Sequence, residues 1–164
     1  MSTQKIEPNS HHVIFDELSI GGTTLHFFSR EETGKAQLGY SIGSDGEDLT
    51  GDEDGDWKKS WEVIGYEDLC GDPIFVDNSS ENQSVYTAMH GMGEWRSIAI
   101  SDSFDAFNKS LRIVAEIAVG RENPVKLEAN PISLAEIEEA LETIRALNPN
   151  SEIEFWELLL GIYR

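Results

Sequence analysis

The chain has 164 residues, a length that fits one domain with a substantial apolar core. Its formal net charge of −19 comes from 31 acidic and 12 basic residues, and this charge disfavours direct binding to nucleic-acid phosphates or to anionic membrane surfaces. Hydrophobic residues make up 39% of the chain and aromatic residues 9%, which excludes wholesale disorder despite the charge.

The amino-terminal residues 1–10 are polar, include Pro8 and show no periodicity, so we expect a flexible arm there and a folded domain over residues 11–164. This arm has no apolar run typical of a signal peptide, and nowhere does the chain approach the roughly 18 consecutive apolar residues of a membrane span. The single cysteine, Cys70, cannot form an internal disulfide. Together these features predict a cytoplasmic protein without a membrane partner.

The first half of the chain predicts β-structure. The segments 12–20 and 23–29 are β-prone and flank Gly21-Gly22, a pair typical of a tight hairpin turn. The segment Gln37–Ile42 is a third candidate strand, and the glycine- and aspartate-rich residues 43–56 form a loop.

Three further strands are expected at 61–66, 73–77 and 84–90, where side chains alternate between two faces. Pro73 lacks an N–H and should therefore begin its strand, and the polar residues 78–83 are short enough for a hairpin loop.

The second half of the chain changes to helical spacing. Apolar residues recur every three or four positions from Phe104 to Ala118 on two faces, so this helix should lie between a sheet and another helix, with Ser101, Asp102 or Ser103 as its cap. Serines three residues before glutamates, at Ser133 and Ser151, predict helices over 133–147 and 152–163. The last helix is apolar nearly all round, so it is either buried within a monomer or shared in a homodimer.

These elements predict an α+β fold: one domain with a central, mostly antiparallel, twisted sheet of about six strands packed by helices.

Catalytic and metal-binding patterns are weak in this sequence. A calcium loop aligned on Gly55 would have Trp61 where a bidentate glutamate is needed, so the acidic stretch is interpreted as a solvated loop or an anionic binding surface. The four histidines lack metal-ligand spacing. His90, beside Glu94, is the best candidate for a general base, but a structural histidine at a strand end fits better. We therefore expect no enzymatic activity, no metal and no cofactor.

Five segments of the middle region occur in a recognisable order: Trp61-Glu-Val-Ile-Gly65, Gly71-Asp-Pro-Ile-Phe-Val-Asp77, Val85-Tyr86, the segment at Trp95, and Ser103-Phe-Asp-Ala-Phe107. This order resembles the SUKH superfamily, which includes fungal cell-wall assembly regulators and bacterial immunity proteins of polymorphic toxin systems. The resemblance implies that residues 71–73 turn into a central strand closed by Asp77, and that Phe104 and Phe107 anchor the next helix. The amino-terminal hairpin departs from the family, whose members commonly begin with a helix.

The resemblance and the charge together suggest a function. Immunity proteins of this family neutralise a toxin by binding it, and nuclease toxins are basic where they hold phosphate, so we expect a basic toxin domain as the partner. The alternatives are a regulatory or scaffold module like the fungal members, and a hydrolase centred on His90. The candidate contact residues are all acidic: Asp45, Glu47, Asp48, Asp52, Glu53, Asp54, Asp56, Glu67, Asp68 and Glu81.

Overall fold

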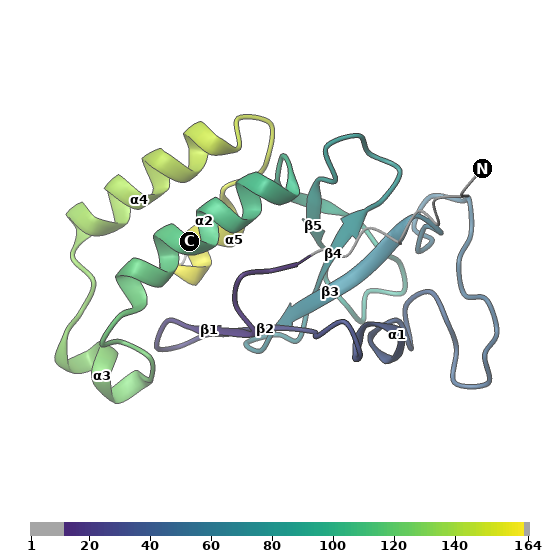
Figure 1. Cartoon of the computed structure of the whole chain (residues 1–164), viewed down its shortest axis with the longest axis horizontal. Helices are drawn as coiled ribbons and strands as arrows, with labels where there is room; N and C mark the ends of the chain where they lie inside the picture. The colour runs from purple at the N-terminus through teal and green to yellow at the C-terminus, as the bar shows by residue number, and fades with distance from the viewer. Residues whose placement is uncertain (1–11, 163–164) are drawn as a thin grey trace, which may run out of the picture.

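The computed structural model describes residues 12–162 and shows an antiparallel six-stranded sheet, with the helices of the second half of the chain gathered at one end of the molecule (Figure 1). The strands pair in chain order, each with the next: β1 (Glu17–Ser19), β2 (Thr24–Phe27), β3 (Trp61–Glu67), β4 (Pro73–Asp77), β5 (Val85–Thr87) and β6 (Ile98–Ser101). The predicted α+β class is confirmed. The predicted arm at 1–10 lies outside the described residues.

The Gly21-Gly22 hairpin is confirmed. Ile20 and Thr23 close the turn, with the Ile20 N–H donating to the Thr23 carbonyl at 3.0 Å. Gly21 has a φ of +76°, and a Cβ at this position would collide with the side chain of Leu127. Only glycine satisfies both conditions, so this turn needs glycine at position 21.

The predicted strand Gln37–Ile42 is wrong, because this segment forms turns and isolated bridges outside the sheet. Leu38 and Ile42 are exposed, whereas Gln37 is buried. The Gln37 side-chain amide accepts from the Val63 N–H and donates to the Val63 carbonyl, both at 2.9 Å. The Gln37 side chain thus satisfies both backbone polar groups of Val63, at a point on β3 where β2 has already ended and no strand pairs with β3 on that side.

The sixth strand is instead β6, which the sequence analysis did not predict. Ile100 is fully buried, and its carbonyl accepts from the Trp156 indole at 2.8 Å. The carbonyl of the preceding residue, Ala99, accepts from the Glu152 N–H at 2.8 Å. Residues far along the chain therefore cover this edge strand and satisfy its outer carbonyls.

The helices are α1 (Thr33–Ala36), α2 (Phe104–Ala118), α3 (Pro124–Ala129), α4 (Leu134–Leu147) and α5 (Glu154–Leu159). Ser103 is the residue that caps α2, accepting from the Ala106 N–H at 3.0 Å. As expected, α2 lies between the sheet and α4. The capping box at Ser133 is also confirmed.

The last predicted helix is shorter than expected, since α5 covers only Glu154–Leu159 of the predicted 152–163, and residues 163–164 lie outside the described chain. Ser151 does not cap it. Its hydroxyl instead donates to the Asp102 carboxylate at 2.5 Å, so a tertiary bond has displaced the local one.

A buried polar network joins α4 to the sheet and to α2. The Asn148 carboxamide accepts from the Ser101 hydroxyl at 2.6 Å and from the Asp102 N–H at 3.0 Å. It donates to the Ser110 hydroxyl and to the Ile144 carbonyl, both at 3.0 Å. All of its hydrogen-bonding capacity is thereby used inside the protein.

The sheet separates two apolar cores. The larger core lies between the sheet and the helices and includes Ile74, Phe107 and Trp156. The smaller core, on the opposite face, consists of Trp57, Val63, Phe75 and Ala88, with partly buried aromatic side chains around it. Strand β4 contributes to both, which explains why four of its five residues are buried.

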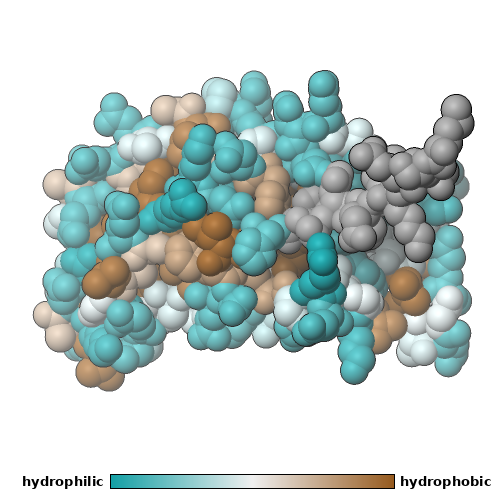
Figure 2. Space-filling model, viewed as in Figure 1, coloured by the Kyte–Doolittle hydropathy of each residue, from teal (hydrophilic) through white to brown (hydrophobic). Residues whose placement is uncertain are grey.

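The face seen in Figure 2 is mostly hydrophilic, with small hydrophobic patches between polar side chains. Within residues 12–162, no helix combines the length and the apolar character needed to cross a membrane.

Candidate functional site

The acidic loop, residues 43–56, lies at the end of the molecule away from helices α2 to α5 and leads directly into the smaller core (Figure 1). Trp57 follows the loop immediately and is 1% exposed. Its ring lies 5.0 Å from that of Tyr40, 4.7 Å from Phe75 and 5.3 Å from Trp95, centroid to centroid. The sequence analysis did not identify Trp57 as important. Its packing against Phe75 of β4 anchors the end of the loop on the sheet.

Backbone hydrogen bonds also order the loop. The Gly51 N–H donates to the Trp57 carbonyl at 3.0 Å, and the Trp95 N–H donates to the Gly55 carbonyl at 2.7 Å. The Lys58 ammonium donates to the Glu53 carbonyl. The loop therefore holds its acidic side chains on a fixed backbone.

Three of the predicted contact residues accept hydrogen bonds from other residues of the loop. Glu47 accepts from the Asp45 N–H at 2.9 Å, and Asp56 accepts from the Glu53 N–H at 3.0 Å. Asp48 accepts from the hydroxyl and the N–H of Thr50, and these bonds hold the pKa of its carboxyl below the usual value. These carboxylates are already used for loop geometry, so they have less capacity for a partner.

The other four predicted residues of the loop are exposed to solvent: Asp45, Asp52, Glu53 and Asp54. Their carboxylates make no hydrogen bond or ion pair with residues 12–162. Asp54 lies close enough to Arg96 to contribute to raising the pKa of that guanidinium, although the larger cause is the 2.6 Å bond between Arg96 and Glu94. These four side chains form the outward anionic surface of the loop.

Glu67 and Asp68 lie elsewhere, in the turn of residues 67–72 between β3 and β4. The Glu67 carboxylate accepts from the N–H groups of Leu69, Cys70 and Asp72 at 2.9 to 3.1 Å. Asp68 accepts from the Thr24 N–H at 2.8 Å and lies 3.3 Å from a ring nitrogen of His26. Both predicted contact residues therefore have structural roles in this turn.

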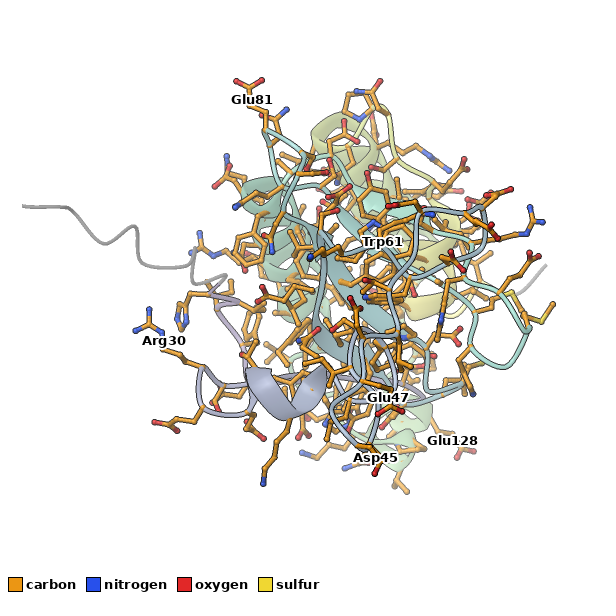
Figure 3. The ribbon with its side chains drawn as sticks, turned by 90° about the vertical axis from the view of Figure 1, so that its right-hand side faces the viewer. Arg30, Asp45, Glu47, Trp61, Glu81 and Glu128 are labelled. Carbon is orange, nitrogen blue, oxygen red and sulfur yellow. The ribbon has the colours of Figure 1, made fainter. Side chains whose placement is uncertain are left out.

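Glu81 is far from the acidic loop. It lies on the β4–β5 hairpin, and Figure 3 shows it at the opposite edge of the molecule from Asp45 and Glu47. The structure thus brings together the predicted residues of the loop, but it does not bring Glu81 to them.

Glu67, Cys70 and Asp72 are also a group of potential metal ligands, with one ligand atom of each within 4.8 Å of the others. Both Glu67 oxygens already accept backbone N–H groups. Asp72 accepts from the His90 N–H at 3.0 Å and lies 2.8 Å from the Nδ1 atom of His90. These hydrogen bonds thus use both Glu67 oxygens and the Oδ1 atom of Asp72.

Within this group, Asp72 also contacts His90, the residue on which the alternative hydrolase function was centred. Asp72 could orient the His90 ring, as a catalytic carboxylate does, and Cys70 is a nucleophilic residue type in the same turn as Asp72. However, the negative charge of Glu67, with smaller contributions from burial and from Asp72, raises the pKa of the Cys70 thiol. A nucleophilic cysteine needs the opposite shift, so this geometry does not favour covalent catalysis.

A cavity of about 570 Å³ lies beside Phe28 and Trp61. Its lining combines the cations Arg30 and Lys59 with the anions Asp16 and Glu62. Because the charges balance, the cavity does not favour an anionic ligand over a cationic one.

Comparison of the chain with protein-family models, with curated proteins and with solved structures finds no match.

Proposed function

We propose that this protein is an immunity-type inhibitor that binds a basic toxin domain, a nuclease, through the outward surface of its acidic loop. The observation that carries the proposal is the set of exposed carboxylates on a loop that Trp57 and backbone hydrogen bonds hold in place. A preordered loop loses little conformational entropy on binding, so more of the electrostatic attraction contributes to affinity.

The charge of the whole chain supports the same proposal. A net charge of −19 attracts a cationic partner over several ångströms and accelerates association, and the effect weakens as salt shortens the Debye length to about 8 Å at physiological ionic strength. Nuclease sites are cationic because they hold phosphate, so an anionic inhibitor both meets them quickly and blocks the substrate.

The experiment is co-expression with basic nuclease toxin domains, of which those encoded beside the gene for this chain are tried first. The test variant carries Asp45→Asn, Asp52→Asn and Asp54→Asn. The control variant removes three charges from the exposed side of α4, through Glu138→Gln, Glu139→Gln and Glu142→Gln.

We expect the unmodified chain and the α4 control to protect the cells, and the loop variant to protect them poorly. The purified pair should associate more slowly as salt rises, and the loop variant should show a weaker salt dependence. Equal killing with and without the chain would refute the inhibitor proposal, and full protection by the loop variant would refute the role of the loop.

A further inference from the structure

An apolar cleft of about 300 Å³ opens where the turn of residues 67–72, the end of β5, the start of β6 and helix α5 meet. Its floor includes the buried side chains of Leu25, Ala88 and Leu159. Its opening is lined by Leu69, Met89, Ile98 and Leu158, which come from four separate segments of the chain. The cleft is therefore a product of the tertiary fold.

The side chains at this opening are unusually exposed for their type. Leu69 is 55% exposed, Met89 56%, Leu158 47% and Ile98 37%. Single exposed apolar residues are normal on protein surfaces, but several around one concave site are typical of a binding surface. Leu134 and Val125 are also exposed but do not line the cleft, so they provide matched controls.

The charged residues that line the cleft are all acidic: Glu67, Asp72 and Glu154. Among its described lining residues there is no lysine, arginine or histidine, although His90 pairs with Asp72 from outside the lining. The raised pKa of the Cys70 thiol, caused first by Glu67, reports the negative potential at this site. The cleft thus combines an apolar interior with an anionic rim.

We propose that this cleft receives an apolar side chain of the basic partner, flanked there by lysine or arginine. The apolar residue would fill the interior, and a neighbouring cation would pair with the exposed Glu154 carboxylate in the negative potential to which Glu67 and Asp72 also contribute. This inference rests on the proposed function for the identity of the partner, and it adds an apolar anchor to the electrostatic contact of the acidic loop.

A second copy of the chain fits the cleft less well. Two copies would bring two anionic rims together, each on a chain with a net charge of −19, and like charges at an interface oppose association. A basic partner has the complementary charge.

The test uses a phage-displayed library of random peptides, selected on the unmodified chain. A cleft variant carries Leu69→Asp and Leu158→Asp, and a control variant carries Val125→Asp and Leu134→Asp. All four positions are exposed, so both variants should keep the fold, which circular dichroism checks. Cys70, the single cysteine, lines the cleft and reports its occupancy through its rate of reaction with a thiol reagent.

We expect the selected peptides to carry a large apolar residue next to lysine or arginine and to slow the Cys70 reaction. They should bind the cleft variant at least about tenfold more weakly than the control variant, since an apolar anchor loses its pocket. Peptides without cations, equal binding to both variants, or an unchanged thiol rate would overturn the inference. So would a dimer of the unmodified chain that the cleft variant abolishes.

Binding measurements with the toxin domains of the co-expression experiment separate this inference from the proposed function. If the peptides behave as expected and the toxin does not bind, the inhibitor proposal fails and the cleft remains a site for basic, apolar segments. If the toxin binds both the cleft variant and the control variant equally, the inhibitor proposal stands and the cleft is not its anchor.

Discussion

Replacing Trp57 with alanine should destabilise the protein and release the acidic loop. The side chain is almost fully buried and touches four aromatic rings, those of Tyr40, Trp61, Phe75 and Trp95. Removing a buried tryptophan side chain typically costs about 3–5 kcal/mol of unfolding free energy. Trp57→Phe keeps most of the ring contacts and loses the 3.3 Å indole bond to the Trp61 carbonyl, so we expect about 1–2 kcal/mol.

Two measurements check this prediction. Urea unfolding followed by circular dichroism gives the change in unfolding free energy, and hydrogen exchange reports the backbone amides of residues 43–56. We expect faster exchange in the loop of the alanine variant, since the Gly51 N–H loses its ordered acceptor at residue 57. An alanine variant within about 1 kcal/mol of the unmodified protein, with unchanged loop exchange, would refute the role given to Trp57.

Three other predictions concern hydrogen bonds and charges described above. Asn148→Ala should lower the unfolding free energy by about 2–4 kcal/mol in urea denaturation, because it leaves buried polar groups without partners. The control variant Asn150→Ala, at an exposed position, should lower the unfolding free energy by less. The Ser133 N–H donates to the Glu136 carboxylate and lowers its pKa below the usual 4.5. On acidification Glu136 is therefore protonated in the unfolded chain before it is protonated in the folded protein. The difference in unfolding free energy between the unmodified protein and Glu136→Gln should shrink as the pH falls below 4.5. Glu67→Gln should speed the reaction of Cys70 with a thiol reagent, because it removes the main charge that raises the thiol pKa; an unchanged rate would contradict that cause.

Local patterns in the sequence predicted the hairpin, the central strands and two helix caps correctly. The Gly-Gly turn, the alternation in β3 and β4, and the serine–glutamate spacing at Ser133 each depend on residues that are close in the chain. The errors arose where distant residues decide the structure. Ser151 precedes a glutamate by three residues, as Ser133 does, but its hydroxyl donates to the Asp102 carboxylate instead of capping a helix.

The two strand errors have the same origin. The segment Gln37–Ile42 was a candidate strand, but the Gln37 side chain makes the two hydrogen bonds to β3 that a strand would make. The short run at β6 gives little local signal, and its pairing depends on β5 and on cover from Trp156. Neither outcome can be read from local periodicity.

The candidate site was only partly predictable for a similar reason. The sequence shows where acidic residues gather, but the structure decides which carboxylates bind the chain's own N–H groups. Asp48 could have been identified, since aspartate two residues before threonine often forms such a turn. Glu67 could not, because it accepts three N–H groups across a six-residue turn that no simple motif describes.

The presence of two cores on opposite faces of one sheet has a consequence for how this protein can evolve or be redesigned. The smaller core needs only four buried residues, and Trp57 is the one that lies next to the acidic loop. Changes to the outward residues of that loop leave the packing of α2, α4 and α5 untouched. The sequence of the loop can therefore change by drift or by grafting, while the helical layer preserves the fold.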